Sequence, residues 1–150
     1  PCLAHKASKE GLIAIDNIQG RKVEELNRKA IPGCTYCEPQ VASVGMREKD
    51  AVEKGIDYKI GKIHYRAIGK AIAVGHLDGF MKLVVDAKTD VVIGAHCIGA
   101  DATELISELT LAVTKGLTAK DIAETIHAHP TLSEITMETA ENVHGEAIHV

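Results

Sequence analysis

Aromatic side chains are scarce in this sequence of 150 residues, which contains no tryptophan, one phenylalanine and three tyrosines. Aliphatic side chains must therefore fill the core, and hydrophobic residues make up 45% of the chain, which is ordinary for a globular protein. No uninterrupted apolar run is long enough to span a membrane, and no signal peptide is visible. The length predicts one domain with a sizeable core, and we expect no association with membranes.

Two further absences exclude classes of function. The 17 lysines and arginines are outnumbered by the 21 aspartates and glutamates, so the sequence lacks the basic excess that binds nucleic acids. No glycine-rich dinucleotide fingerprint follows an expected strand, because Gly69, Gly94 and Gly99 are isolated glycines. We therefore expect no nucleic-acid partner, and we expect that the chain does not bind a nicotinamide dinucleotide in the usual way by itself.

The cysteines Cys2, Cys34, Cys37 and Cys97 do not form the pattern of a secreted disulfide scaffold, which favours a reducing compartment such as the cytoplasm. Cys34 and Cys37 form a C-x-x-C motif. A redox pair of this kind normally opens a helix, whereas this motif lies in a strand-like stretch flanked by proline and glycine. A zinc site would need a second cysteine pair, so we interpret these residues as incidental thiols.

Strand-like segments dominate the centre of the chain and helical spacing dominates its last third, which predicts an α+β domain with an antiparallel sheet covered by helices. Gly11 is expected to end the first helix, and Gly61 interrupts the alternation of one strand and predicts a β-bulge. Asp101 and Thr118 are expected to cap the helices that follow them. The expected helices cover residues 1–11, 47–54, 102–116, 118–125 and 132–143, and the expected strands cover residues 34–37, 41–44, 57–65, 80–87 and 91–97.

The stretch from His127 to Glu134 combines two imidazoles, a proline and a carboxylate between two expected helices. Thr131 and Glu134 have the spacing of a capping box, so Thr131 is expected as the N-cap and Glu134 as the third residue of the last helix. Pro130 biases His129 toward an extended conformation, and a tight turn at this point favours a cis His129–Pro130 bond. Glu134 is then a candidate partner for one ring nitrogen of His129, which leaves the other nitrogen free to take or give a proton.

Two other interpretations of this stretch stay open. Glu134 can serve only to complete a capping box, with His129 as a surface histidine ahead of the helix. His127 and His129 also form a His-x-His pair that suits a metal geometrically, but the spacing shows no third ligand, so we expect no metal site.

The residue order His-x-His-Pro-Thr-Leu-Ser-Glu resembles the C-terminal signature of the dihydrolipoamide dehydrogenases, a family of flavin enzymes within the pyridine nucleotide–disulfide oxidoreductases. Residues 3–7, 31–32, 38–45 and 94–99 resemble further segments of the same family at corresponding places. The likeness therefore covers nearly the whole chain.

The resemblance stops at the N-terminal features of the family. Its flavin fingerprint, its nicotinamide fingerprint and its redox-active cysteine pair have no counterpart here, and Cys34 and Cys37 do not match that pair. The resemblance implies the C-terminal part of such an enzyme. Residues 1–28 would be the remnant of a flavin-binding domain with its linker, and residues 29–150 would be the interface domain.

The resemblance also implies roles for individual residues. The interface domain would form a homodimer, and His129 would accept a proton from a dihydrolipoamide thiol across that interface. Glu134 would orient the imidazole and stabilise its charge, and His127 would either help to position this base or line the pocket. The segment that contacts the flavin would be Cys2, Leu3, Ala4 and His5.

The full-length enzyme that the resemblance implies would use FAD and NAD and would act on the lipoyl domains of 2-oxo-acid dehydrogenase complexes. It would work in the cytoplasm, or in the mitochondrial matrix of a eukaryote. The chain alone is expected to bind no cofactor and to be inactive. The alternatives are a related disulfide reductase of the glutathione type and a stand-alone dimerisation module without chemistry.

Overall fold

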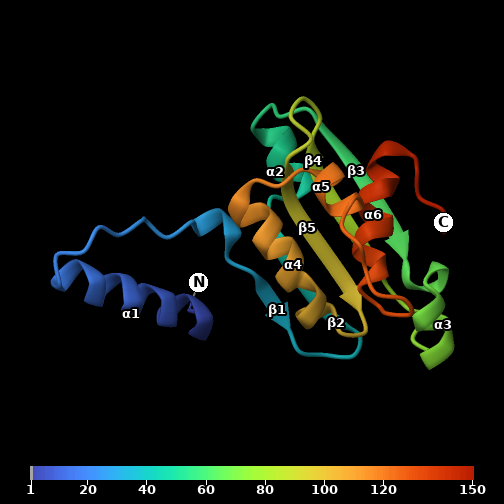
Figure 1. The fold of residues 1–150 in the computed structure, drawn as a ribbon, viewed down its shortest axis with the longest axis horizontal. Helices are drawn as coiled ribbons and strands as arrows, with labels where there is room; N and C mark the ends of the chain where they lie inside the picture. Colours follow the sequence, from blue (N-terminus) through green and yellow to red (C-terminus); the bar gives the residue numbers. More distant parts are fainter. Residues whose placement is uncertain (1) are drawn as a thin grey trace.

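The computed structural model describes residues 2–150 and contains one five-stranded antiparallel sheet with the strand order β1-β2-β5-β4-β3 (Figure 1). Its central hairpin joins β4 to β5, and β2 and β3 flank this hairpin on either side. The predicted α+β class is confirmed. The strands are β1 (Gly33–Thr35), β2 (Gln40–Gly45), β3 (Tyr58–His64), β4 (Phe80–Asp86) and β5 (Val92–Gly99).

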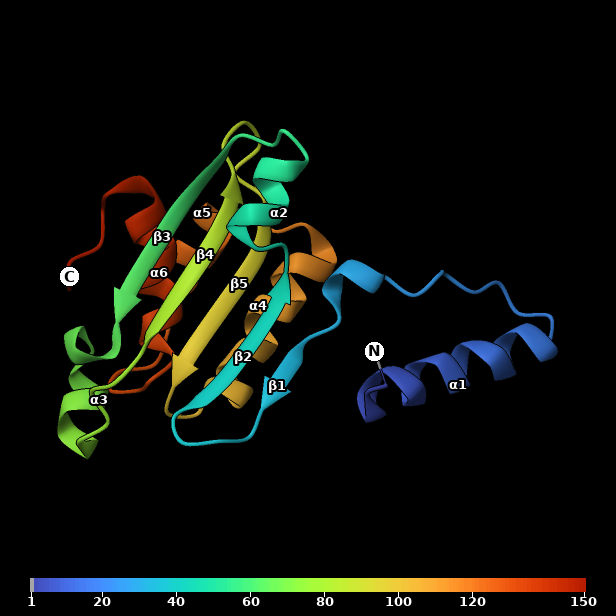
Figure 2. The same ribbon diagram turned by 180° about the vertical axis from the view of Figure 1, so that it is seen from behind.

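Three helices cover one face of the sheet. Figure 1 shows α4 (Ala102–Lys115), α5 (Ala119–Ala123) and α6 (Glu134–His144) in front of the strands. Figure 2 shows the opposite face, with α2 (Glu48–Glu53) near one end of the sheet and α3 (Gly69–Val74) beyond the other. None of the helices in residues 2–150 has the length and hydropathy needed to cross a membrane.

The core lies between the sheet and the helices α4, α5 and α6. Ile106 and Leu109 of α4 and Ile135 of α6 are fully buried against the strands, at the helical spacing that the sequence shows. Aliphatic side chains fill most of this core, as the scarcity of aromatic residues requires. The strand residues in it are Ala42, Val44, Ile63, Met81, Leu83, Val85, Val92, Ala95 and Cys97.

The first helix is longer than the sequence predicts, because α1 runs from Ala4 to Ile18 and passes through Gly11. A glycine inside a helix costs only about 1 kcal/mol relative to alanine, and the surrounding residues are good helix formers. Gly20, whose φ is 68°, supplies the left-handed residue after the helix that Gly11 was expected to supply. None of the described α1 residues is buried, and Figure 1 shows this helix apart from the sheet.

The β-bulge predicted at Gly61 is wrong. The pairing of β3 with β4 is continuous through Gly61, and the register shift lies instead between Val84 and Val85, where β4 pairs with β5. Gly61 serves a different purpose, because a Cβ atom there would collide with the backbone carbonyl of Thr139 in α6. The glycine therefore allows a helix to cross the strand closely.

The caps of α4 and α5 differ from each other. Thr118 is the expected N-cap of α5, and it forms a capping box with Asp121. Asp101 stands at the N-cap position of α4, but its backbone is left-handed (φ 54°) and its side chain makes no capping hydrogen bond. The amide oxygen of Gln40 in β2 accepts instead from the Thr103 N–H at 3.1 Å, so a distant strand residue replaces the expected local cap.

Candidate active site

The candidate site lies in the connection between α5 and α6. Helix α6 begins at Glu134 with Ser133 as its N-cap, so the expected positions of Thr131 as N-cap and Glu134 as third residue are wrong. The Thr131 hydroxyl donates to the Ala128 carbonyl at 2.6 Å and lies 2.7 Å from the Ser133 hydroxyl. Because these contacts occupy the hydroxyl, residues 131–133 form a separate turn ahead of the helix.

The carboxylate of Glu134 holds this turn and the imidazole of His129 together. Its Oε1 atom lies 2.8 Å from Nδ1 of His129, and its Oε2 atom accepts from the Thr131 N–H at 2.8 Å. The expected contact between His129 and Glu134 is therefore present, and the His129–Pro130 bond is cis. A carboxylate accepts, so this contact assigns the proton of a neutral His129 ring to Nδ1.

The other ring nitrogen of His129 is available for chemistry. Within the described residues, the structure shows no hydrogen-bond partner for Nε2, and the His129 side chain is 76% exposed. A neutral imidazole with a fixed Nδ1 proton presents a lone pair on Nε2, which can accept a proton from a substrate. The geometry is that of a base with an orienting carboxylate.

The electrostatics of Glu134 match an orienting role. Burial raises the pKa of its carboxyl, but the hydrogen bonds from the Thr131 N–H and from His129 outweigh burial, and the pKa lies below its ordinary value. Glu134 is therefore ionised at neutral pH. A negative charge at 2.8 Å stabilises the imidazolium that forms when His129 takes up a proton.

His127 lies close to His129 in sequence but in a different environment. Its side chain is only 5% exposed, Nδ1 lies 2.8 Å from the Thr125 carbonyl, and Nε2 lies 3.0 Å from the Glu108 carboxylate. Both nitrogens are occupied, so this imidazole has neither one free for a metal or a substrate. Within residues 2–150, no group of three or more His, Cys, Asp or Glu side chains is placed to hold a metal ion.

Sequence reasoning did not identify Glu108. The residue belongs to α4 and lies 19 positions before His127, so no local spacing links the two. Glu108 is half-buried on a helix that lies beside the connection of residues 124–133, and this proximity can be recognised only once the fold is known.

The structure does not bring the four expected flavin-contacting residues to the His129 site. Figure 1 shows α1 and α6 on opposite sides of α4. Cys2 is exposed, and Leu3 is the N-cap of α1 without a side-chain hydrogen bond. Ala4 begins the helix, and Nε2 of His5 lies 2.9 Å from the Pro32 carbonyl.

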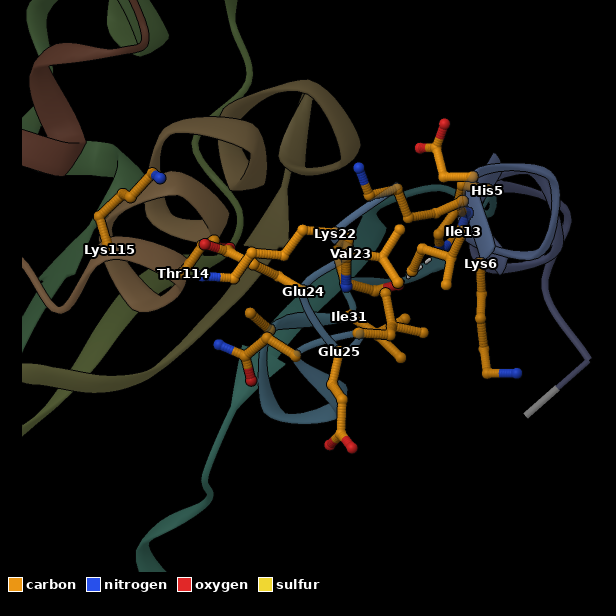
Figure 3. Close-up of a pocket in the computed structure, with 16 residues that line it drawn as sticks. His5, Lys6, Ile13, Lys22, Val23, Glu24, Glu25, Ile31, Thr114 and Lys115 are labelled. Atoms are coloured by element: carbon orange, nitrogen blue, oxygen red, sulfur yellow. Dashed lines mark hydrogen bonds between the residues drawn. The ribbon is translucent and has the colours of Figure 1, made fainter. Parts of the chain in front are cut away.

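A hollow of about 520 Å³ lies beside α1 and is also lined by residues 22–27 and the end of α4 (Figure 3). It includes His5 but none of residues 127–134. The hollow is therefore separate from the candidate site.

The C-x-x-C motif shows no sign of activation. Burial raises the pKa of the Cys34 thiol, and the Cys37 thiol donates to the Pro39 carbonyl at 3.0 Å. Reactive cysteines need a lowered pKa, which this site does not supply to Cys34. The geometry agrees with the interpretation of incidental thiols.

Residues 31–140 match a family described as the pyridine nucleotide-disulphide oxidoreductase dimerisation domain. The chain belongs to this family. Its match to the dimerisation domain covers the whole sheet and the His129 connection, so the candidate site lies inside the family's own domain. The recognition of this family from the sequence is confirmed.

Two curated relatives support the assignment. The chain is 50% identical over 150 residues to the dihydrolipoyl dehydrogenase of Zymomonas mobilis and 49% identical to that of Bacillus subtilis. These matches cover 99% and 100% of this chain but 32% of each relative, so the chain spans about a third of the relatives' length. Among solved structures, LpdA from Mycobacterium tuberculosis matches with a TM-score of 0.88 and 26% identity, over 93% of this chain and 30% of that protein.

Proposed function

We propose that this dimerisation domain belongs to a flavin-dependent dihydrolipoyl dehydrogenase and that it supplies His129 as the acid–base group for the oxidation of dihydrolipoamide. The observation that carries the proposal is the 2.8 Å contact between His129 Nδ1 and Glu134, which leaves Nε2 free and exposed. The identities of 50% and 49% to two dihydrolipoyl dehydrogenases support this substrate class.

The proposed chemistry begins with a proton transfer. Oxidation of dihydrolipoamide joins its two sulfurs in a disulfide and releases two electrons and two protons. Nε2 of His129 takes the proton of one thiol, and the resulting thiolate attacks a redox-active disulfide elsewhere in the enzyme, which forms a mixed disulfide and releases one cysteine as a thiolate. Glu134 stabilises the imidazolium during this step. The second substrate thiol then loses its proton and attacks the mixed disulfide, which forms the lipoamide disulfide and releases the second cysteine, so that the enzyme's cysteine pair holds the two electrons. Bound FAD and NAD supply the electron-acceptor chemistry in the holoenzyme.

The chain's own contribution to flavin binding is proposed to be small. Leu3 provides no side-chain cap, so the first N–H groups of α1 can face a polar edge of the cofactor, next to Cys2, Ala4 and His5. Residues 2–150 contain no glycine-rich phosphate fingerprint, so these residues fit an edge contact and not a complete binding site.

The proposed assembly is a homodimer with the boundary of the interface domain at residue 29, and with lipoyl domains of 2-oxo-acid dehydrogenase complexes as partners. The chain alone is expected to dimerise but to be colourless and inactive. Light scattering on the isolated chain measures its mass, and a monomer at high micromolar concentration would contradict the dimer. A flavin spectrum with turnover in the isolated chain would contradict its inactivity.

The decisive experiment substitutes His129 in the full-length flavoprotein that contains this chain. His129→Gln should lower turnover with dihydrolipoamide by about 10²- to 10⁴-fold, which is the usual effect of losing a positioned base. Glu134→Gln should cost less, because it keeps a hydrogen-bonding side chain and loses only the charge. His76→Gln, at an exposed histidine after α3, is the matched control. Wild-type turnover in His129→Gln with full flavin content would show that the catalytic assignment is wrong.

A further inference from the structure

We propose that Glu108 is a positioning residue for His129, and that it acts through the buried imidazole of His127. This inference rests on the proposed function of His129. Glu108 does not touch the reacting atoms; it fixes one end of the segment that presents them. The inference assigns a purpose to a carboxylate on α4 and to the first histidine of the His-x-His pair.

The contacts of His127 have defined hydrogen-bond directions. The Thr125 carbonyl can only accept, so Nδ1 of His127, at 2.8 Å, must donate to it. Nε2 lies 3.0 Å from Oε1 and 3.3 Å from Oε2 of Glu108, and an ionised carboxylate also only accepts. The second contact is therefore a hydrogen bond only when a proton lies between Nε2 and Glu108.

Burial makes this contact important for the local structure. The His127 side chain is 5% exposed and that of Glu108 is 36% exposed. A buried ring nitrogen that loses its partner has little water to replace it, so the imidazole would have to move toward solvent. Movement of His127 displaces the backbone on either side of it.

His129 depends on this backbone because it has little packing of its own. Its side chain is 76% exposed, and only Ala128 separates it from His127. Glu108 on α4 holds the segment before His129, and Glu134 on α6 holds the imidazole itself. Helices α4 and α6 both pack on the same face of the sheet, so the two carboxylates form two anchors on one rigid support.

The two anchors restrict the direction of Nε2 of His129. With Glu134 alone, the imidazole keeps its partner, but the chain before it can shift. A displacement of about 1 Å at a catalytic group can reduce the rate about 10²-fold. Loss of Glu108 should therefore slow proton transfer without removing any group from the site.

The test measures the rate of flavin reduction by dihydrolipoamide in the full-length holoenzyme by stopped flow. Glu108→Ala should reduce the limiting rate by about 10- to 100-fold, with flavin content retained. Glu108→Gln should restore most of the rate, because its amide N–H can donate to an unprotonated Nε2 of His127 and keep the ring in place. Glu104→Ala is the matched control, since this exposed carboxylate lies one turn earlier on α4.

A double-mutant cycle separates positioning from general destabilisation. If Glu108 acts through His129, Glu108→Ala should cause no further loss in a His129→Gln background. An equal loss in both backgrounds, or a wild-type rate for Glu108→Ala alone, would overturn the positioning role while the proposed function stands. A wild-type rate for His129→Gln would contradict the proposed function and the positioning role together.

A second variant keeps the test decisive if Glu108→Ala does not fold. His127→Asn retains a donor for the Thr125 carbonyl but is too short to reach Glu108. It should show the same loss of limiting rate as Glu108→Ala. A wild-type rate in folded His127→Asn would show that the contact between Glu108 and His127 does not position His129.

Discussion

Gly61 of β3 lies directly beneath the backbone carbonyl of Thr139 in α6, with no space for a Cβ atom between them. The side chain of Val143 closes over the same glycine. Helix α6 begins with Glu134, so the distance between the helix and the sheet also determines how far the candidate site lies from the sheet. The position of the Glu134 carboxylate is thus linked to the absence of a side chain at Gly61 in β3.

We predict that Gly61→Ala destabilises the domain by about 1 to 3 kcal/mol, the usual cost of inserting a methyl group into a packed interior. Urea denaturation measures this change. Gly69→Ala is the matched control, because a Cβ at Gly69 meets nothing within 4 Å and its stability should stay equal or rise slightly. Equal stabilities for Gly61→Ala and the wild type would show that α6 can lift away without cost.

We predict that the contribution of Glu134 to stability is lost in acid. The pKa of Glu134 in the folded chain lies below its ordinary value of 4.5, so the unfolded chain takes up this proton first as the pH falls. The stabilisation is present above the ordinary value and disappears as the pH falls through the folded value. Urea denaturation at about pH 6 and about pH 3 should show a wild-type advantage over Glu134→Gln that shrinks in acid. A constant difference would contradict the prediction.

We predict that Cys97 is inert toward thiol reagents in the folded protein. Burial raises the pKa of its thiol to about 11, and the hydrogen bond with the Tyr65 hydroxyl at 3.3 Å offsets this only in part. The thiolate is the reactive form, so a neutral reagent should label the exposed Cys2 and Cys37 first. Mass spectrometry identifies the labelled sites, and denatured protein is the control in which Cys97 should react. Labelling of native Cys97 as fast as Cys37 would contradict its burial.

The features predicted correctly from the sequence are local or repetitive. The contact between His129 and Glu134 spans five positions, and the cap that Thr118 provides to α5 reaches only to the N–H of Asp121, three positions later. The helical spacing in α4 identifies the buried Ile106 without knowledge of its neighbours. The α+β fold class follows from the order of the segments in the sequence, with strands in the centre and helices in the last third.

The features that the sequence did not predict depend on residues far apart in the chain. Gln40 caps a helix 63 positions later, and Glu108 meets His127 over 19 positions. The break in the alternating pattern at Gly61 suggests a β-bulge, because the sequence of the strand carries no information about the helix that crosses the strand there. The helix start at Glu134 differs because the Thr131 hydroxyl donates to a carbonyl behind it, and spacing alone does not reveal that choice.

The two outer strands of the sheet bear on aggregation. An unpaired strand edge is a template on which another chain can extend the sheet, but β1 is only three residues long and follows Pro32. On the other edge, β3 exposes Lys59 and Lys62, and the outward N–H of Lys62 donates to the Asn142 side chain of α6 at 2.9 Å. A very short edge strand and lysines on the other edge are both features that oppose the addition of a further strand. We therefore expect these edge features to disfavour the edge-to-edge pairing of two copies into a continuous, fibre-like sheet.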